Sequence, residues 1–163
     1  MSVYVLALLI GVVAGLRAMT APTAISWATH LGWLPLAGTS LAFFGFGVTP
    51  YIFTVLAVAE LVTDQLPETP SRTVPLQFGA RIVLGGLCGA AITGAHGGLA
   101  GGSIVGVLGA VVGVAGAVIG TLGGAKARAA MARTFGRDAP AALIEDVVAI
   151  VGAALIVVSL HGF

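Results

Sequence analysis

The sequence predicts an all-α protein, a single integral membrane domain over residues 1–163 built as a polytopic bundle of about five transmembrane helices. Composition provides the first observation, because 58% of the residues are apolar and only 8% are charged. An ordinary soluble domain carries about 25% charged residues, so a soluble fold of this chain would lack a surface suited to water. The second observation is a mean hydropathy of +1.12. The third is the content of 25 glycines with few aromatic residues, which is typical of helices packed in lipid.

The expected spans follow from length and hydropathy. A transmembrane helix needs about 20 mostly apolar residues to cross roughly 30 Å of hydrocarbon. Four segments meet this requirement, and a fifth does so although it contains two carboxylates; they lie at about 3–22, 50–66, 79–98, 99–125 and 140–160. The first should be a mature span, since it lacks the positively charged start of a secretory signal. Thr49-Pro50 and Asp138-Ala139-Pro140 combine a capping side chain with a proline, so helices should begin there.

Two segments between the spans need separate interpretations. Residues 31–48 are apolar but are interrupted by Pro35 and several glycines. Their longest unbroken helical pattern is too short to cross a bilayer, so an interfacial or re-entrant segment is favoured over a sixth span. Prolines 67, 70 and 75 should end the second helix and form a surface loop.

The basic residues predict an orientation. They gather in two loops, near 67–81 and 126–137, as Arg72, Arg81, Lys126, Arg128, Arg133 and Arg137. Because cytoplasmic loops carry the excess of Lys and Arg, both loops should be cytoplasmic in a bacterial inner membrane. Five spans then place the N-terminus inside and the C-terminus outside.

Glycines are regularly spaced in the most apolar stretch, GGSIVGVLGAVVGVAGAVIGTLGG at 101–124. Steps of four and three residues separate Gly102, Gly106, Gly109, Gly113, Gly116, Gly120 and Gly123. Such steps trace one stripe along a helix, and a stripe without side chains lets a neighbouring backbone approach closely. We interpret it as a tight interface within the chain; a homodimer contact and a groove for lipid or substrate are the alternatives.

Carboxylates in two spans predict a polar site. Glu60 and Asp64 share one face of the second expected helix, and Glu145 and Asp146 lie near the start of the last one. Both pairs lie near the membrane face that bears the basic loops. Ionised groups inside a membrane are costly and usually face a polar cavity with a partner. These acids either line a cytoplasm-facing cavity that binds a proton or a cation, or anchor helix ends at the headgroup boundary by pairing with Arg72, Arg81, Arg128 or Arg137.

Arg17 is the other intramembrane charge, about 21 Å along the first expected helix and so near the far leaflet. It would either extend to the outer interface or contact an anion or an acid. Thr20 and Pro22 follow it and suggest a broken helix whose carbonyls could line a site.

Several classes of site and partner are disfavoured. A net charge of +1 gives no basic field for nucleic acid. The three histidines have no helical ligand spacing, so no zinc site is expected. No nucleophile elbow or phosphate-binding loop occurs, so the chain is not expected to be an enzyme. Cys88 is interpreted as a packing residue.

Three stretches carry a resemblance to a known family: GLRAMTAPTAISWA, AELVTDQLPETPSRTVPLQFGARI and GRDAPAALIEDVVAI. They resemble a bacterial family of small polytopic inner-membrane proteins catalogued as a domain of unknown function, over nearly the whole chain. The resemblance implies a polytopic inner-membrane protein and no particular activity. The run AELVTDQ is also similar to the acidic helix motif of cation exchangers such as the manganese and calcium exporters. Here the acids are four residues apart rather than three, and threonine replaces a glycine.

These observations lead to one functional expectation and two alternatives. We expect a small transporter or exchanger coupled to protons or to a divalent cation (Mn²⁺, Mg²⁺ or Ca²⁺), with carboxylate ligands in Glu60, Asp64, Glu145 and Asp146. Arg17 and Arg81 would balance charge or select an anionic group. The alternatives are a lipid-binding or scaffold protein that does not transport, and a flippase for an anionic lipid. Membrane lipids and a second copy of the chain are the expected partners.

Overall fold

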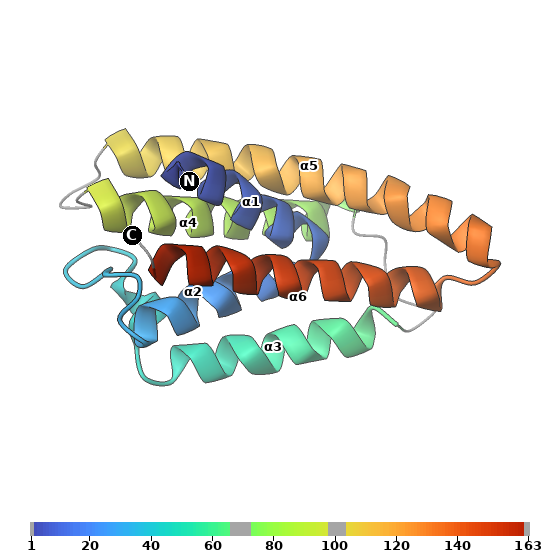
Figure 1. The fold of residues 1–163 in the computed structure, drawn as a ribbon, viewed down its shortest axis with the longest axis horizontal. Coiled ribbons are helices and arrows are strands. Elements are labelled where there is room, and N and C mark those ends of the chain that lie inside the picture. The colour runs from blue at the N-terminus through green and yellow to red at the C-terminus, as the bar shows by residue number, and fades with distance from the viewer. Residues whose placement is uncertain (1, 66–72, 98–103, 162–163) are drawn as a thin grey trace.

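The computed structural model describes residues 2–65, 73–97 and 104–161. Within these ranges the chain is helical apart from its connections, and most helices run along one long axis (Figure 1). In chain order the elements are α1 (Val3–Leu16), α2 (Thr20–His30), the 3-10 helix η1 (Ala42–Gly45), α3 (Thr49–Thr63), α4 (Pro75–Gly97), α5 (Ile104–Phe135) and α6 (Ala139–His161).

Three helices form the centre of the bundle. α1, α4 and α5 pack on one another, and α6 lies against α1 and α5. The remaining elements form a second layer, in which α3 packs mainly on α2 and η1. The apolar core runs through both layers, because fully buried Ile10 of α1, Ile92 of α4 and Phe44 of η1 belong to one cluster. α3 is therefore the most peripheral of the helices described.

The glycine stripe of α5 contacts α4 along part of its length. A Cβ atom added to Gly113 would lie 2.2 Å from the carbonyl oxygen of Gly85, and one added to Gly89 would lie 2.3 Å from that of Gly109. Real Cβ contacts are never so short, so the α4 and α5 backbones approach closely only because these positions lack side chains. The expected close contact within the chain is present here.

The same stripe serves a second neighbour further along α5. Cβ atoms added to Gly116 and Gly120 would lie 2.2 Å from the backbone oxygens of Leu8 and Val12, both in α1. Two helices, α4 and α1, therefore pack against the glycine stripe of α5. At Gly123 an added Cβ would have no atom within 4 Å, so the close contact ends before it. Gly106 is buried in α5, and Gly102 lies outside the described residues.

The first expected span is wrong as a single helix. α1 ends at Leu16, Arg17 is extended with φ −136° and ψ 111°, and α2 begins at Thr20. Pro22 falls in the first turn of α2, where its missing N–H costs no helical hydrogen bond. The chain reverses at this break, and α2 runs back along the bundle (Figure 1).

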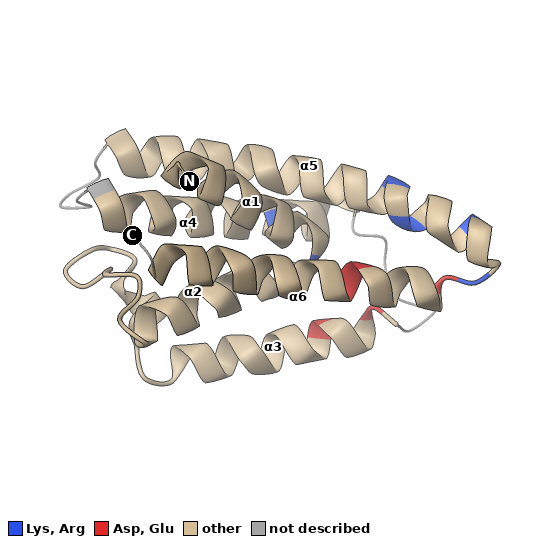
Figure 2. Ribbon diagram, in the orientation of Figure 1, with Lys and Arg blue, Asp and Glu red and all other residues tan. Residues whose placement is uncertain are grey.

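This reversal also changes the expected topology. The N- and C-terminal ends lie toward the same end of the bundle, opposite the end where the charged residues gather (Figures 1 and 2). The two ends therefore do not lie at opposite ends of the bundle as five successive spans would place them, because α2 adds a return leg. Arg17 consequently lies at the charged end with the carboxylates, and its expected place near the far leaflet is also wrong.

Other boundaries agree with the sequence or extend it. α3 and α6 begin at Thr49 and Ala139, close to the expected starts, but Thr49 is the first residue of α3 rather than its cap, and Val48 at the cap position makes no side-chain cap hydrogen bond. α5 continues to Phe135 through a region expected to be a loop, since Ala, Lys, Arg and Met favour helix strongly. It ends before Gly136, whose φ of +67° suits a glycine that terminates a helix.

Residues 31–48 form loops around η1 and contain no helix long enough to cross a bilayer, which agrees with the interpretation against a sixth span. The prolines at 67 and 70 lie outside the described residues.

Three of the described helices are long and apolar enough to cross a membrane: Pro75–His96 within α4, Ile104–Phe135 and Ala139–His161. α1 and α3 are apolar but shorter. Large apolar side chains on the outer faces remain exposed, for example Val55 of α3, Val111 of α5 and Leu155 of α6. A continuous apolar exterior of this kind suits a lipid environment.

Candidate functional site

The break between α1 and α2 exposes backbone groups that helices normally satisfy internally. The last carbonyls of a helix lack amide partners and carry a partial negative charge. Arg81 of α4 meets them, since its Nη1 donates to the carbonyl oxygens of Leu16 at 2.9 Å and Gly15 at 3.2 Å. The Thr121 hydroxyl of α5 also lies 3.2 Å from the Gly15 carbonyl oxygen, while its shorter hydrogen bond, at 2.8 Å, goes to the Ala117 carbonyl of its own helix. A buried cation therefore terminates α1.

The opposite side of the break receives an anion. The backbone N–H groups of Ala18 and Met19, just before α2, each donate to a carboxylate oxygen of Glu60 at 2.8 Å. A carboxylate at a helix N-terminus is stabilised by the free amides and the positive end of the helix dipole. Glu60 Oε1 also lies 3.4 Å from Nη2 of Arg81. The Arg81–Glu60 ion pair thus satisfies the free carbonyls at the end of α1 and the free amides just before α2.

Arg17 occupies the centre of a second set of contacts. Its side chain is 0% exposed, forms an ion pair with Asp64, and donates from Nε to Asp146 Oδ1 at 2.5 Å. The second Asp146 oxygen accepts from Gln65 Nε2 at 3.2 Å. Within the described part of the chain, Nη2 of Arg17 has no hydrogen-bond partner. Arg17 therefore joins α1 to α3 and α6 from the interior of the bundle, so its expected alternative role as partner of an acid is correct.

Arg128 forms a third group at the charged end. It pairs with Asp138 and lies 3.7 Å from Oε2 of Glu145, which is only 5% exposed. Its Nη2 also donates to the backbone oxygen of Asp64 at 3.3 Å. Arg128 thus links α5 to α6 and to the end of α3, while Glu145 lies outside the set around Arg17.

The charges around the break do not cancel. In the portions of the chain that the structure describes, two guanidinium groups, Arg17 and Arg81, pair with three carboxylates, Glu60, Asp64 and Asp146. We call these five residues the break cluster. With every group ionised it carries one excess negative charge, in a setting where charge is costly.

An open cavity lies beside the break cluster, between α3 and α4, with a volume of about 270 Å³. Its polar lining consists of Glu60, Thr63, Asp64, Gln77 and Arg81. Apolar residues of α3, α4 and the helix break complete the wall. The cavity therefore brings two acids of the break cluster and one of its arginines to one accessible surface.

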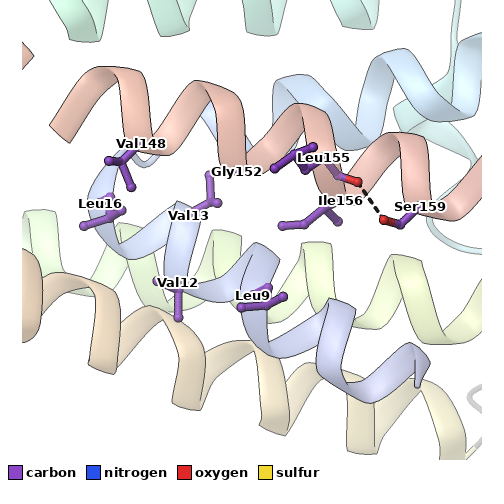
Figure 3. Close-up of a pocket in the computed structure, with 9 residues that line it drawn as sticks. All are labelled: Leu9, Val12, Val13, Leu16, Val148, Gly152, Leu155, Ile156 and Ser159. Atoms are coloured by element: carbon purple, nitrogen blue, oxygen red, sulfur yellow. Dashed lines mark hydrogen bonds between the residues drawn. The ribbon is translucent and has the colours of Figure 1, made fainter. Parts of the chain in front are cut away.

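A second cavity, of about 350 Å³, lies between α1 and α6. Figure 3 shows Leu16 and Val148 at one end and Ser159 at the other. The Ser159 hydroxyl is the polar side-chain group drawn in this lining, and it donates to the carbonyl of Leu155 in its own helix at 2.8 Å. This cavity offers hydrocarbon surroundings and no reactive group.

The metal site expected from four carboxylates does not form among the described residues, where no group of three or more Asp, Glu, His or Cys side chains could hold a metal ion. The physical reason is that each acid lies against an arginine, which supplies the positive charge that a cation would otherwise supply. The expected alternative in which arginines pair with the acids describes these contacts better. Arg72, one of its expected partners, lies outside the described residues.

Sequence reasoning missed two polar members of the site, Gln65 and Gln77. Gln77 stands four residues before Arg81 and therefore on the same face of α4, a signal that could have found it. Gln65 follows the end of α3, and its contact with Asp146 crosses 81 positions of sequence. No local pattern indicates that pairing.

Comparison of the chain with known protein families, characterised proteins and solved structures finds no match. The resemblances to a family of small inner-membrane proteins and to cation exchangers therefore remain predictions.

Proposed function

We propose that this protein is a small membrane transporter coupled to protons, with the break cluster as its coupling site. The observation that carries the proposal is that, among the residues the structure describes, the three carboxylates of the break cluster lie against two buried guanidinium groups beside an open cavity. Low dielectric surroundings favour neutralisation of such a charge by a proton or a bound cation. Helix ends that meet inside a bundle and contact charged groups are also a recurrent feature of transporter sites.

The proposed transport cycle moves α3. This helix packs mainly on α2 and η1, and its last turns meet α1 and α4 through Glu60 and Asp64. Protonation of either acid removes its charge and weakens its hold on Arg81 or Arg17. The end of α3 then separates from α4 and widens the cavity. A cation in the cavity neutralises the same excess negative charge that a proton neutralises, so binding of a cation and deprotonation of the acids favour each other, which couples the two events.

The proposal includes an orientation. The end of the bundle that carries Arg128, Arg133 and Arg137 faces the cytoplasm of a bacterium, as expected for basic residues beside spans, and both chain ends face the other side. Arg81 lies about 24 Å along α4 from its end at Gly97, at 1.5 Å per residue. A hydrocarbon layer of roughly 30 Å then places the break cluster near its cytoplasmic side. Reporter domains fused to each chain end should both be active on the outer side.

Proton coupling can be tested in reconstituted vesicles. Vesicles that hold the purified chain and an entrapped pH dye receive an acidic interior, and Na⁺, K⁺, Mn²⁺ and small organic cations are added one at a time outside. At least one cation should accelerate the loss of internal protons. Glu60→Gln and Asp146→Asn should abolish the response. Asp138→Asn is the matched control, because Asp138 pairs with Arg128 at the same end but lies outside the break cluster.

Two results would refute the proposal. One is a folded parent protein that moves no protons with any of these cations. The other is an unchanged response in both break-cluster variants. In the first case, co-purified phospholipid bound to the inert protein would favour the lipid-binding alternative.

A further inference from the structure

We infer that the cavity between α3 and α4 binds a small organic cation that bears N–H groups, an ammonium or guanidinium compound with a short apolar tail. The inference rests on the proposed function and names its substrate class. The charge, the hydrogen-bond capacity and the size of the cavity each support this ligand class.

The charged groups that line the cavity determine the sign of the charge on the ligand. Two carboxylates, Glu60 and Asp64, line the cavity together with one guanidinium, that of Arg81. Arg81 is already engaged by the carbonyl oxygens of Gly15 and Leu16. An incoming anion would meet the excess carboxylate, whereas a cation would compensate it.

Hydrogen-bond capacity determines the kind of cation. Arg81 Nη2 stands 3.4 Å from Glu60 Oε1, which is long for a charge-assisted hydrogen bond, normally about 2.7–2.9 Å. Both Glu60 oxygens accept a backbone N–H at 2.8 Å, but a carboxylate offers about four acceptor positions in all, so Glu60 can also accept a bond from a donor in the cavity. The side-chain oxygen of Gln77 is a further acceptor in the wall. The lining contains no aromatic residue, so the aromatic faces that recognise quaternary ammonium groups are missing from it. N–H donors fit these walls better than methylated nitrogen.

Size and apolar surface determine the remainder of the ligand. The volume of about 270 Å³ holds roughly nine water-sized groups at about 30 Å³ each. Ala18, Met19, Leu56, Ala59 and Ala80 line the cavity beside the charged groups. A cationic head of three or four heavy atoms with a short alkyl tail would fill this space, with its head at Glu60 and its tail against the alanines.

The test measures binding of n-butylguanidinium to the purified full-length protein in detergent by equilibrium dialysis. This probe keeps its charge at all working pH values and bears N–H donors. Saturable binding is expected, and Glu60→Gln and Asp64→Asn should each weaken it about tenfold or more, as expected when a charge-assisted hydrogen bond is lost. Asp138→Asn should bind as the parent does. Tetramethylammonium, a cation without N–H groups, should bind about tenfold more weakly, and butyrate should not compete.

A second variant separates loss of the ligand site from loss of the fold. Ala59→Leu adds bulk to the cavity wall without touching an ion pair, and Ala59 is exposed at the cavity. It should unfold as the parent does and yet bind n-butylguanidinium about tenfold more weakly. The inference is overturned if the folded parent does not bind the probe, if tetramethylammonium binds equally well, or if Ala59→Leu and Glu60→Gln leave binding unchanged.

This experiment distinguishes the inference from the proposed function. Binding of n-butylguanidinium without any cation-driven proton movement in vesicles would support the ligand class and refute transport. Proton movement driven by another cation, with no binding of n-butylguanidinium, would refute the ligand class alone.

Discussion

Replacement of Gly113 by alanine should separate α4 from α5 and destabilise the bundle. The new Cβ would lie 2.2 Å from the Gly85 carbonyl oxygen and 3.0 Å from the Gly85 carbonyl carbon. Ordinary contact begins near 3.4 Å, so one backbone must move by about 1 Å, which forfeits a quarter to a half of each dispersion contact along the interface. Overpacking of this kind costs about 1–3 kcal/mol. Because both obstructing atoms belong to a backbone, no side chain can move aside to relieve the clash.

Gly123→Ala is the matched control on the same helix, since its added Cβ would meet no atom within 4 Å. Alanine is favoured over glycine in a helix by about 1 kcal/mol, so this variant should be as stable as the parent or slightly more stable. Both variants gain this helix-propensity term, so we expect them to differ by the overpacking cost alone, about 1–3 kcal/mol in the free energy of unfolding. Reversible unfolding in mixed micelles, followed by far-ultraviolet circular dichroism, measures this difference. Equal stability of the two variants would refute the close approach of α4 and α5.

Three further predictions concern the break cluster. Arg17→Met should lower the free energy of unfolding by about 3 kcal/mol or more, because it leaves the carboxylates of Asp64 and Asp146 without their partner. Adding Asp146→Asn to this variant should recover part of the loss in the same micelle titration. No recovery would contradict the pairing of Arg17 with Asp146. Thr121→Val keeps the side-chain shape but removes the hydroxyl, which lies 2.8 Å from the Ala117 carbonyl oxygen and 3.2 Å from that of Gly15. It should cost about 1 kcal/mol, and a neutral result would show that the hydroxyl contributes nothing to stability. Glu60→Leu removes the acceptor of the backbone amides of Ala18 and Met19, just before α2. Hydrogen exchange at these amides should accelerate about tenfold, as for the loss of a helix cap. An unchanged exchange rate would argue against capping by Glu60.

Local signals in the sequence were sufficient for several elements. Pro50 and Pro140 mark the starts of α3 and α6, because the fixed φ angle of proline suits the first turn of a helix and acts locally. The spacing of glycines in α5 predicted a stripe of close contact for the same reason. The sequence did not predict that this stripe divides between α4 and α1, since the division depends on which helices pack there.

The helix break shows where local reasoning fails. Hydropathy alone continues through Arg17 as one span, whereas the chain ends α1 there and reverses. The contacts that stabilise this reversal come from Glu60 and Arg81, more than 40 positions away. A local window contains the signal for a weak helix, namely Thr20 and Pro22, but not the partners that make the break stable.

By itself the sequence determined that this chain is a bundle of apolar helices with glycine-mediated contacts and acids near one end, because composition and spacing act within a helix or on its exposed face. Only the tertiary structure decided that Arg17 lies among those acids, that Arg81 and Glu60 terminate the two halves of a broken helix, and that a cavity opens beside them. The physical reason is that a buried charge is stable only next to its partner, and the partner of each charge is chosen by the packing of helices distant in sequence.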